Sequence, residues 1–410
     1  MRNSLDNPFH PGSDTVPDVW AGRTEQLSDW RDVVRPRRLA GLPERGRTIL
    51  GEPGLGKSSL VRRIARDAER AGDWVTPQLR IPSGADPLKL VAEAALKLAD
   101  QAGLPASADK RVGQLLERVR EVSVSGIKLS LQRVSGPEPY TTLTQLLVEV
   151  GRAAIRANNV VALIHIDEVQ NVSDEDTLSQ LLIALGDALT YGVDVPLPGG
   201  VTALRSLPIA VYLTGLPDFE DMAGARKGAT FARRFKTTTL HAIDEDDLLE
   251  ALQPFVIEGW EVSNGAGGLG RIFMEPAAAD RIVELCQGEP FLFQLAGEQA
   301  WYAGTGTMIT ADEVNRGWRG ATREATAHVE RILDRLPRRE RQMVQAMADL
   351  PPEGRTATNV AEKMGFTKVT EAGPYAQRLD TMRGIINRGK PYTFRHRAVE
   401  AYLTSDWPNI

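Results

Sequence analysis

Residues 51–58 read Gly51-Glu-Pro-Gly-Leu-Gly56-Lys57-Ser58 and match the pattern GxxxxGK[ST] at every fixed position. The short run TIL precedes this motif, and a helical pattern, SSLVRRIARDAERA, follows it. Glycines let backbone N–H groups turn inward around an anion, and the helix N-terminus adds favourable partial charge. A chance match in an ordinary loop is the alternative, and the flanking strand and helix argue against it. The motif therefore predicts a phosphate-binding loop between a strand and a helix.

Two side chains of the motif supply the polar chemistry of a nucleotide site. The ammonium of Lys57 provides a cation for the β- and γ-phosphates, and the hydroxyl of Ser58 is a ligand for Mg²⁺. The sequence therefore predicts bound ATP or ADP with Mg²⁺. The other residues expected to line this site are Glu52, Pro53, Gly54, Leu55, Gly56 and Ser59.

A second run, Val160-Val-Ala-Leu-Ile-His-Ile-Asp167-Glu168, places two carboxylates after a strand-sized apolar stretch. We expect Asp167 to hold Mg²⁺ through water and Glu168 to polarise the attacking water as a general base. A strand followed by a solvated acidic turn is the alternative. The phosphate loop earlier in the chain favours the metal site.

Further polar residues stand beside the fourth and fifth expected strands. Thr214 ends the run IAVYLTG, where a hydroxyl can orient water or sense the γ-phosphate, although a simple strand-end cap is the alternative. Arg233 and Arg234, in FARRF, precede the fifth strand. An arginine there can stabilise charge on the transferred phosphoryl group, in cis or from a neighbouring subunit. A solvated helix end is the other interpretation.

Short apolar runs alternate with longer helical patterns up to residue 243, which is typical of an α/β fold with a parallel sheet. The expected strands cover residues 48–50, 74–81, 160–166, 209–214 and 237–243. Alternating apolar and polar residues around a glycine predict a small hairpin near residues 122–134. Residues 1–18, rich in Asn, Pro and Asp, are expected to form a flexible arm.

The pattern becomes helical after residue 243. Helices are expected over residues 244–252, 276–287, 290–303 and 310–336, with a loop or hairpin over 259–270. From Pro337, three helices precede a hairpin over 385–394 and a last helix over 398–405, which is the winged-helix order. The dipeptide Gly373-Pro374 favours a recognition helix that begins at Pro374, since proline breaks a helix beyond its first turn.

Composition and charge restrict the class of protein. The chain has 410 residues, 42% hydrophobic and 25% charged, as in a globular protein of two or three domains. Its single cysteine, five scattered histidines and lack of a signal-like or membrane-spanning apolar run predict a cytoplasmic protein with no zinc site and no membrane partner. Residues 316–410 carry 17 Lys+Arg and 11 Asp+Glu, a net +6, whereas the whole chain carries -5. This basic end fits either a nucleic-acid contact or a solvated arginine-rich surface.

Taken together, these motifs resemble the AAA+/STAND branch of P-loop ATPases, in the style of origin-recognition-like AAA+ proteins. The resemblance covers residues 17–405. It identifies residues 51–58 and 164–168 as Walker A and Walker B, Thr214 as sensor 1, and Arg233 and Arg234 as the arginine-finger position. It implies that the box around Val19, Gly22 and Arg23 lies against adenine and ribose. It further implies sheet order 5-1-4-3-2 in a core over residues 19–243, a helical lid over 244–336 and a winged helix over 337–410.

Two segments depart from the usual AAA+ pattern. Where many members carry a sensor-2 arginine, the chain reads Gly288-Glu289-Pro290, which is similar to the GxP motif of STAND ATPases. The run Phe394-Arg-His396-Arg397 is similar to the MHD element, in which the histidine touches the ADP β-phosphate. The resemblance thus implies that Pro290 and His396 contact nucleotide. A surface histidine at a strand–helix junction is the alternative.

The leading hypothesis is an ATP-hydrolysing switch that couples nucleotide state to DNA binding through the winged helix. The residues expected to contact DNA are Lys368, Gln377, Arg378, Arg383, Arg388 and Lys390. Arginine action in trans would also require a homo-oligomer. The alternative is a STAND-type signalling or scaffold ATPase with a protein partner, for example in cell defence, whose winged helix is an internal lock. An exposed basic patch favours DNA, and a basic set facing the nucleotide or lid favours the lock.

Overall fold

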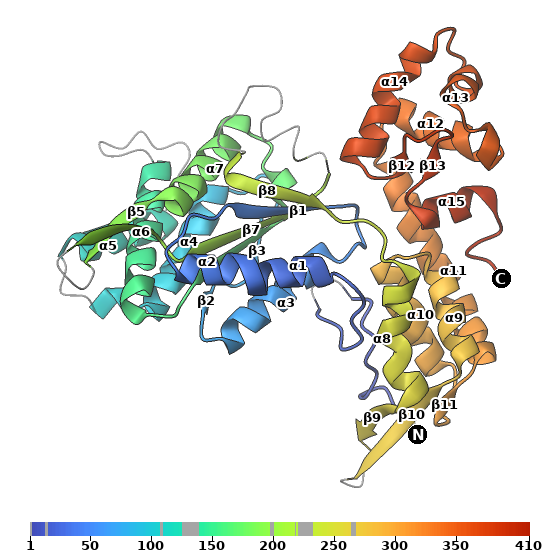
Figure 1. Ribbon diagram of the computed structural model, residues 1–410, viewed down its shortest axis with the longest axis horizontal. Helices are drawn as coiled ribbons and strands as arrows, with labels where there is room; N and C mark the ends of the chain where they lie inside the picture. The colour runs from blue at the N-terminus through green and yellow to red at the C-terminus, as the bar shows by residue number, and fades with distance from the viewer. Residues whose placement is uncertain are drawn as a thin grey trace. The chain divides into compact units, whose positions relative to one another are not determined.

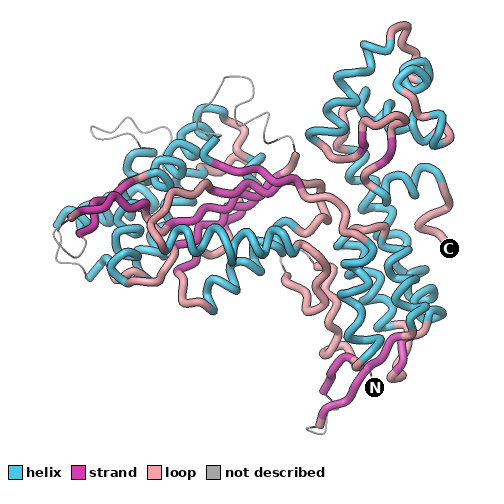
Figure 2. Tube along the Cα trace, in the orientation of Figure 1, coloured by secondary structure: helices cyan, strands magenta, loops and turns pink. Residues whose placement is uncertain are grey.

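The structure, a computed structural model, describes residues 2–12, 15–106, 110–124, 139–196, 201–217, 219, 233–263 and 268–410. Figures 1 and 2 show its helices and strands. The chain divides into two compact units. The first comprises Met1–Arg23, Gly51–Ser59 and Thr239–Ile410, and the second comprises Thr24–Leu50 and Leu60–Thr238.

A parallel sheet organises the second unit. Its strand order is β2-β4-β7-β1-β8, and a short strand, β3, also pairs with β4. Numbered along the chain as five strands, this order is 5-1-4-3-2 and confirms the expected fold. The strands are β1 (Gly46–Leu50), β2 (Trp74–Val75), β3 (Leu79–Arg80), β4 (Ala162–Asp167), β7 (Ile209–Gly215) and β8 (Phe235–Thr239).

The apolar strands lie in the core of this unit. Every residue of β1, β4 and β7 is buried, as expected for central parallel strands covered on both faces. Helices pack beside them, among them α4 (Pro87–Gln101), α6 (Pro139–Ala157) and α7 (Glu175–Thr190). The expected strand over residues 74–81 is instead two short strands, β2 and β3. Pro77 lies between them, and proline has no N–H to donate to a ladder.

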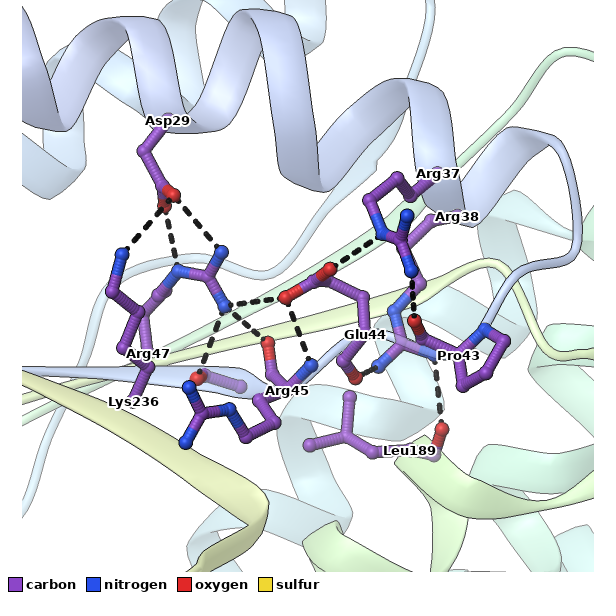
Figure 3. A network of polar contacts seen from close by, with 10 residues as sticks. Asp29, Arg37, Arg38, Pro43, Glu44, Arg45, Arg47, Leu189 and Lys236 are labelled. Atoms are coloured by element: carbon purple, nitrogen blue, oxygen red, sulfur yellow. Dashed lines mark hydrogen bonds and ion pairs between the residues drawn. The ribbon is translucent and has the colours of Figure 1, made fainter.

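Arginines hold a run of short helices beside the start of β1 (Figure 3). Arg47 on β1 pairs with Asp29 at 2.6 Å and with Glu44 at 3.1 Å. The buried Arg38 donates to the carbonyl of Leu189 at 2.9 Å. Such buried guanidinium groups require these acceptors, because an unpaired buried charge is costly. The three helices are α1 (Thr24–Ser28), η1 (Asp29–Val34) and α2 (Arg35–Leu39).

Two further segments of this unit bear on the expected hairpin. Residues 122–124 belong to a helix, α5 (Lys110–Val124), and residues 125–134 lie outside the described part of the chain. An antiparallel pair that the sequence analysis missed precedes β7 instead. It consists of β5 (Gly192–Pro196) and β6 (Thr202–Ser206).

Four lid helices and a small sheet form much of the first unit. The predicted helices are present. An antiparallel pair begins in the segment 259–270 and continues to Met274, and a third strand, at residues 308–309, pairs parallel to it. Thr310 and Glu313 form a reciprocal capping box at the start of a 24-residue helix, α11. The elements are α8 (Glu245–Ile257), β9 (Trp260–Ser263), β10 (Leu269–Met274), α9 (Pro276–Cys286), α10 (Pro290–Tyr302), β11 (Met308–Ile309) and α11 (Ala311–Asp334).

The N-terminal segment packs on this lid, which corrects the expectation of a flexible arm. Phe9 is fully buried, and its ring stacks on Phe255 with centroids 5.6 Å apart. The indole of Trp301 donates to the carbonyl of Asn3 at 2.7 Å. The polar composition of residues 1–18 gave no sign that Phe9 would be buried. Burial of a phenylalanine side chain stabilises the folded state by roughly 1.5–3 kcal/mol.

The winged-helix order of helices and hairpin is confirmed in the same unit. The recognition helix begins at Val369, not at Pro374, which lies inside it. A π-helical turn continues this helix beyond Gln377, so the helix accommodates the proline without a break. The elements are α12 (Arg338–Ala348), α13 (Ala357–Lys363), α14 (Val369–Gln377), η8 (Arg378–Met382), β12 (Ile386–Asn387), β13 (Thr393–Phe394) and α15 (Arg397–Thr404).

Candidate functional site

The phosphate loop follows β1 directly in the chain and adopts a conformation that requires glycine. Gly54 and Gly56 have φ values of +86° and +78°, in the left-handed region. A Cβ at Gly54 would lie 2.3 Å from Cε1 of His328, so the backbone and this ring are in close contact. Helix α3 (Lys57–Arg70) begins at the end of the loop and directs its N-terminus toward it. This geometry fits an anion held by backbone N–H groups.

The cation of the loop is held near its own backbone. Lys57 Nζ donates to the carbonyl oxygens of Gly51 at 2.8 Å and Glu52 at 3.0 Å. Both bonds are to neutral carbonyl groups, which a phosphate oxygen would replace with a stronger, charge-assisted partner. The donor set therefore fits a nucleotide phosphate.

Arg23 braces the loop from the N-terminal segment. Its guanidinium donates to the carbonyl oxygens of Leu55 at 3.0 Å and His241 at 2.7 Å. Burial lowers the pKa of Arg23 to about 10, although Glu289 and two aspartates oppose the shift. Gly22 has φ +58°, and a Cβ there would lie 2.7 Å from a carboxylate oxygen of Asp247. The predicted box thus reaches the loop backbone through Arg23.

Two other residues predicted to contact nucleotide, Val19 and Pro290, lie in or against the lid. Val19 is buried, and its carbonyl accepts a hydrogen bond of 2.8 Å from Gln294. The first residue of α10 is Pro290, whose ring lies 3.7 Å from the Cβ position of Gly56. Its neighbour Phe291 donates its backbone N–H to the carbonyl of Gly54 at 3.2 Å. The start of α10 therefore contacts the phosphate loop.

A fully buried carboxylate, Glu289, lies between two histidines. His396 Nε2 is 2.9 Å from Glu289 Oε1, and His328 Nε2 is 3.3 Å from Oε2. Burial alone would raise the pKa of Glu289, but the charge of His396 and hydrogen bonds from both histidines hold it at about 2. Burial likewise opposes ionisation of His396, but the neighbouring Glu289 raises its pKa. His396, expected to contact nucleotide, thus lies against a carboxylate of the lid.

Glu52 extends from the phosphate loop to the end of the lid. Its side chain is buried, and its Oε2 accepts a 3.0 Å hydrogen bond from Arg335 Nη1. Burial raises the pKa of Glu52, against the charges of Arg335, Arg383 and His396. Arg335 is the C-cap of α11, two residues before the winged helix begins at Pro337. The second position of the phosphate loop is therefore linked to the lid–winged-helix junction.

The acidic end of β4 in the second unit is rigidly positioned. Asp167 is buried, and its Oδ1 accepts hydrogen bonds from the hydroxyl of Thr214 and, at 2.9 Å, from the N–H of Glu168. Its Oδ2 accepts a 2.9 Å bond from Gln78, which is bonded in turn to Arg62 at 2.6 Å. Both carboxylate oxygens are thus fixed at the carboxyl edge of the sheet, where a hard cation such as Mg²⁺ finds oxygen ligands.

Glu168 has a backbone conformation that is rare for its residue type. Its φ of +60° and ψ of +40° are left-handed, and its carboxylate accepts a hydrogen bond from Gln170. The side-chain amide oxygen of Gln170 is itself bonded to the N–H of Leu216 at 3.1 Å. Strain of this kind costs of order 1–3 kcal/mol and is concentrated at functional sites. It supports the interpretation of Glu168 as the base.

The two finger-position arginines differ in their surroundings. Arg234 pairs with Asp187 on α7, and its side chain lies against Gly186. Arg233 is exposed. Only Arg233 is therefore presented to solvent without a described ion pair, although both remain proposed finger residues.

The winged-helix residues that were expected to contact DNA also divide into two groups. Four are exposed, as a nucleic-acid contact requires: Lys368, Gln377, Arg388 and Lys390. Arg378 is half-exposed, lies over the Tyr375 ring at 5.6 Å and pairs with Glu340 at 3.0 Å. Arg383 is buried and pairs with Glu340 at 2.8 Å. The prediction that Arg383 contacts DNA is wrong for this conformation, because the side chain is held in the domain interior.

Sequence reasoning missed four residues of these surroundings: Gln78, His328, Arg335 and Glu340. None belongs to a motif. His328 lies 39 residues after its partner Glu289, and Arg335 lies 283 residues after Glu52. Only packing in the folded protein brings these pairs together. The available signal was the amphipathic pattern of α11, which carries His328 and is capped by Arg335.

Comparisons with known proteins agree with this fold. No family model matches the sequence. A relative, the ORC1-type DNA replication protein 2 of Archaeoglobus fulgidus, is 29% identical over 113 residues, which are 28% of this chain and 29% of that protein. The match therefore spans less than a third of that relative.

Two solved structures resemble the chain over nearly its whole length. The ORC2 protein of Aeropyrum pernix, solved in ADPNP–ADP complexes, gives a TM-score of 0.56 at 16% identity, with 96% of this chain and 95% of that chain covered. A Walker-type ATPase of Pyrococcus abyssi gives 0.52 at 16% identity, with 94% and 96% covered. Among the described helices, none combines the length and apolarity needed to cross a bilayer. The chain therefore has the fold of these two proteins over nearly its whole length, winged helix included.

Proposed function

We propose that the chain binds and hydrolyses ATP and that nucleotide state controls DNA binding by the winged helix. The observation that carries the proposal is the phosphate loop, in which left-handed glycines, Lys57 and a helix N-terminus converge. The Aeropyrum pernix ORC2 protein, which shares the fold, is described in ADPNP–ADP complexes. This supports adenine nucleotide as the ligand.

The residues divide the reaction between them. Lys57 and the loop N–H groups would bind the phosphates. Ser58 and Asp167 would hold Mg²⁺, which would neutralise charge on the phosphates. Glu168 accepts a proton from the attacking water. Thr214 fixes Asp167 through its hydroxyl, and Arg233 or Arg234 stabilises the transferred phosphoryl group, from a neighbouring subunit in a homo-oligomer.

The exposed basic residues of the winged helix support DNA as the partner. Arg388 and Lys390 lie in the turn between β12 and β13, where a wing contacts phosphate. Lys368 and Gln377 are exposed at the two ends of α14. The net charge of +6 over residues 316–410 adds a favourable field. The Archaeoglobus fulgidus relative is named a DNA replication protein, which agrees with this partner class.

One observation favours the second candidate, a signalling ATPase with a protein partner. His396 of the winged helix is held by Glu289 of the lid, at 2.9 Å and fully buried, as an internal lock would be. Both candidates use the same nucleotide chemistry. They differ in whether the exposed wing binds DNA.

A salt-titrated binding assay tests both parts. Binding of labelled ATP and of duplex DNA is measured for wild type and Lys57→Ala, and each ligand is tested in the absence and in the presence of the other. We expect Lys57→Ala to lose tight ATP binding, because the β/γ cation is gone. We expect wild type to bind duplex DNA with an affinity that falls steeply with salt and depends on nucleotide. Absence of any duplex binding at low salt would favour the protein-partner candidate.

A further inference from the structure

Two buried carboxylates, one in the phosphate loop and one in the lid, hold the winged helix and its junction with the lid at two points. At the first, the Glu52 carboxylate of the loop holds Arg335 at the lid–winged-helix junction, at 3.0 Å. At the second, the Glu289 carboxylate holds His396, the N-cap of α15, at 2.9 Å. All four residues belong to the first compact unit.

Glu52 is the residue at which these contacts meet the nucleotide chemistry. Its backbone carbonyl accepts a 3.0 Å hydrogen bond from Lys57 Nζ, and its side chain accepts one from Arg335. We propose that Glu52 transmits the position of the Lys57 ammonium to Arg335, so that phosphate binding and winged-helix docking oppose each other. The proposal rests on the nucleotide function proposed above and names how that site is regulated.

The mechanism follows from what each group can bond to. When Lys57 turns to a phosphate, the carbonyl of Glu52 loses its cation, and an anion lies close to a carboxylate that is already buried. Both changes weaken the ion pair between Glu52 and Arg335. The phosphate and the Glu52 carboxylate are both negative, and like charges at short range repel strongly at low dielectric. Linkage is reciprocal, so a docked winged helix must lower the affinity for triphosphate by the same factor.

The second contact, between Glu289 and His396, also links docking of the winged helix to the phosphate loop. His328 donates to the carboxylate of Glu289, and its ring contacts Gly54 of the loop. A contact series therefore runs from Gly54 through His328 and Glu289 to His396. Glu52 also lies close enough to His396 for the two charges to attract. A shift of the loop thus reaches the winged helix by two routes.

The test compares neutral, isosteric variants of the full chain. Glu52→Gln and Glu289→Gln remove the two buried charges. Glu400→Gln is the matched control, because Glu400 pairs with Arg355 at 2.5 Å wholly inside the winged helix. Hydrogen exchange is measured without nucleotide over β12, β13 and α15, and affinity is measured with a fluorescent ATP analogue.

We expect exchange over these elements to rise in Glu52→Gln and Glu289→Gln but not comparably in Glu400→Gln. We also expect the two variants to bind the analogue about 5-fold more tightly or better, the low end of typical coupling between sites. Unchanged exchange and unchanged affinity, relative to Glu400→Gln, would overturn the proposal.

A further pair protects the test against misfolding. Arg335→Gln and Arg335→Lys alter a partly exposed side chain, and the lysine keeps the charge. The proposal requires Arg335→Gln to behave as Glu52→Gln and Arg335→Lys to restore part of the wild-type exchange. Equal effects of both Arg335 variants would contradict it. If wild type binds no ATP analogue, the nucleotide function fails, and the exchange comparison alone then decides whether the two carboxylates dock the winged helix.

Discussion

The hydroxyl of Thr214 at the end of β7 donates a hydrogen bond to Oδ1 of Asp167 at the end of β4. These strands are neighbours in the sheet, and both side chains are buried. The residue expected to sense the γ-phosphate and the residue expected to hold the metal are therefore one bonded pair. A change at either position should be felt at the other, because the bond is inaccessible to water.

ATP hydrolysis should depend on Glu168, whereas ATP binding should not. Glu168→Gln keeps the shape of the side chain and its contact with Gln170 but removes the basic group. We expect turnover to fall by about 10²–10⁴ while ATP affinity stays near wild type. Steady-state hydrolysis and equilibrium binding check this, with the exposed Glu69→Gln as control. A parental rate in Glu168→Gln would show that another group is the base.

Arg233 should act between subunits more readily than Arg234. Arg234 is paired with Asp187 of its own chain, whereas Arg233 is exposed. We expect Arg233→Ala to remove most of the activity that rises with protein concentration, and Arg234→Ala to remove less. Mixing Arg233→Ala with Lys57→Ala should restore turnover at mixed interfaces. A rate independent of concentration, with no gain on mixing, would leave both arginines acting in cis or structurally.

The wing should contribute DNA affinity without sequence preference. Replacing Arg388 and Lys390 by Ala should weaken binding to all duplexes about equally and make the slope of log K against log salt shallower by roughly 2. ATP hydrolysis should change little, because these side chains are exposed. The control is Arg319→Ala/Arg323→Ala, an equal charge change on α11 of the lid. Equal slope changes in both double variants would indicate a diffuse field instead of a wing contact.

The Glu289–His396 pair should make stability depend on pH. The pKa of His396 is raised above 6.5, so its contribution is complete below 6.5 and is lost as pH rises through the folded-state value. The pKa of Glu289 is about 2, below 4.5, so its contribution is complete above 4.5 and is lost as pH falls toward 2. Glu52, whose pKa is raised, acts in the opposite sense to Glu289. Stability from the pair is therefore greatest between about 4.5 and 6.5.

Thermal unfolding at several pH values checks this. At pH 6, His396→Asn should cost about 3–5 kcal/mol, as for one partner removed from a buried pair. The cost should shrink as pH rises through the folded-state pKa of His396, where wild type loses the charge as well. A cost that is constant with pH would mean that His396 is neutral throughout and contributes only by packing.

The thiol of Cys286 should be inert in the folded protein. Burial raises the pKa of Cys286 to about 12, and the chain has no other cysteine. Only the thiolate reacts quickly with disulfide reagents, so labelling should await opening of the lid. Thiol labelling at pH 8 with and without denaturant measures this. Rapid labelling of the folded chain would contradict the packing of α9.

The sequence predicted the sheet and the loop because each has a local signal. Continuous apolar runs mark β4 and β7, and the glycine spacing marks the phosphate loop. Asp167 and Thr214 could be predicted as site residues because each is a polar residue at the end of an apolar strand. The partners of Glu289 carry no such signal, since His328 and His396 come from separate helices. Arg383 was misjudged for the same reason: a basic residue after a recognition helix looks exposed until Glu340 is known to lie beneath it.

The packing of Phe9 on the lid has a consequence for how the chain is synthesised. Phe9 leaves the ribosome early, but Phe255 and Phe293, which its ring contacts, are added much later. The hydrogen bond from Trp301 to Asn3 spans 298 residues. Closing so long a loop is entropically costly and slow. Phe9 therefore stays exposed until residues 255–293 have been translated, and a chaperone that shields it would act before the lid exists.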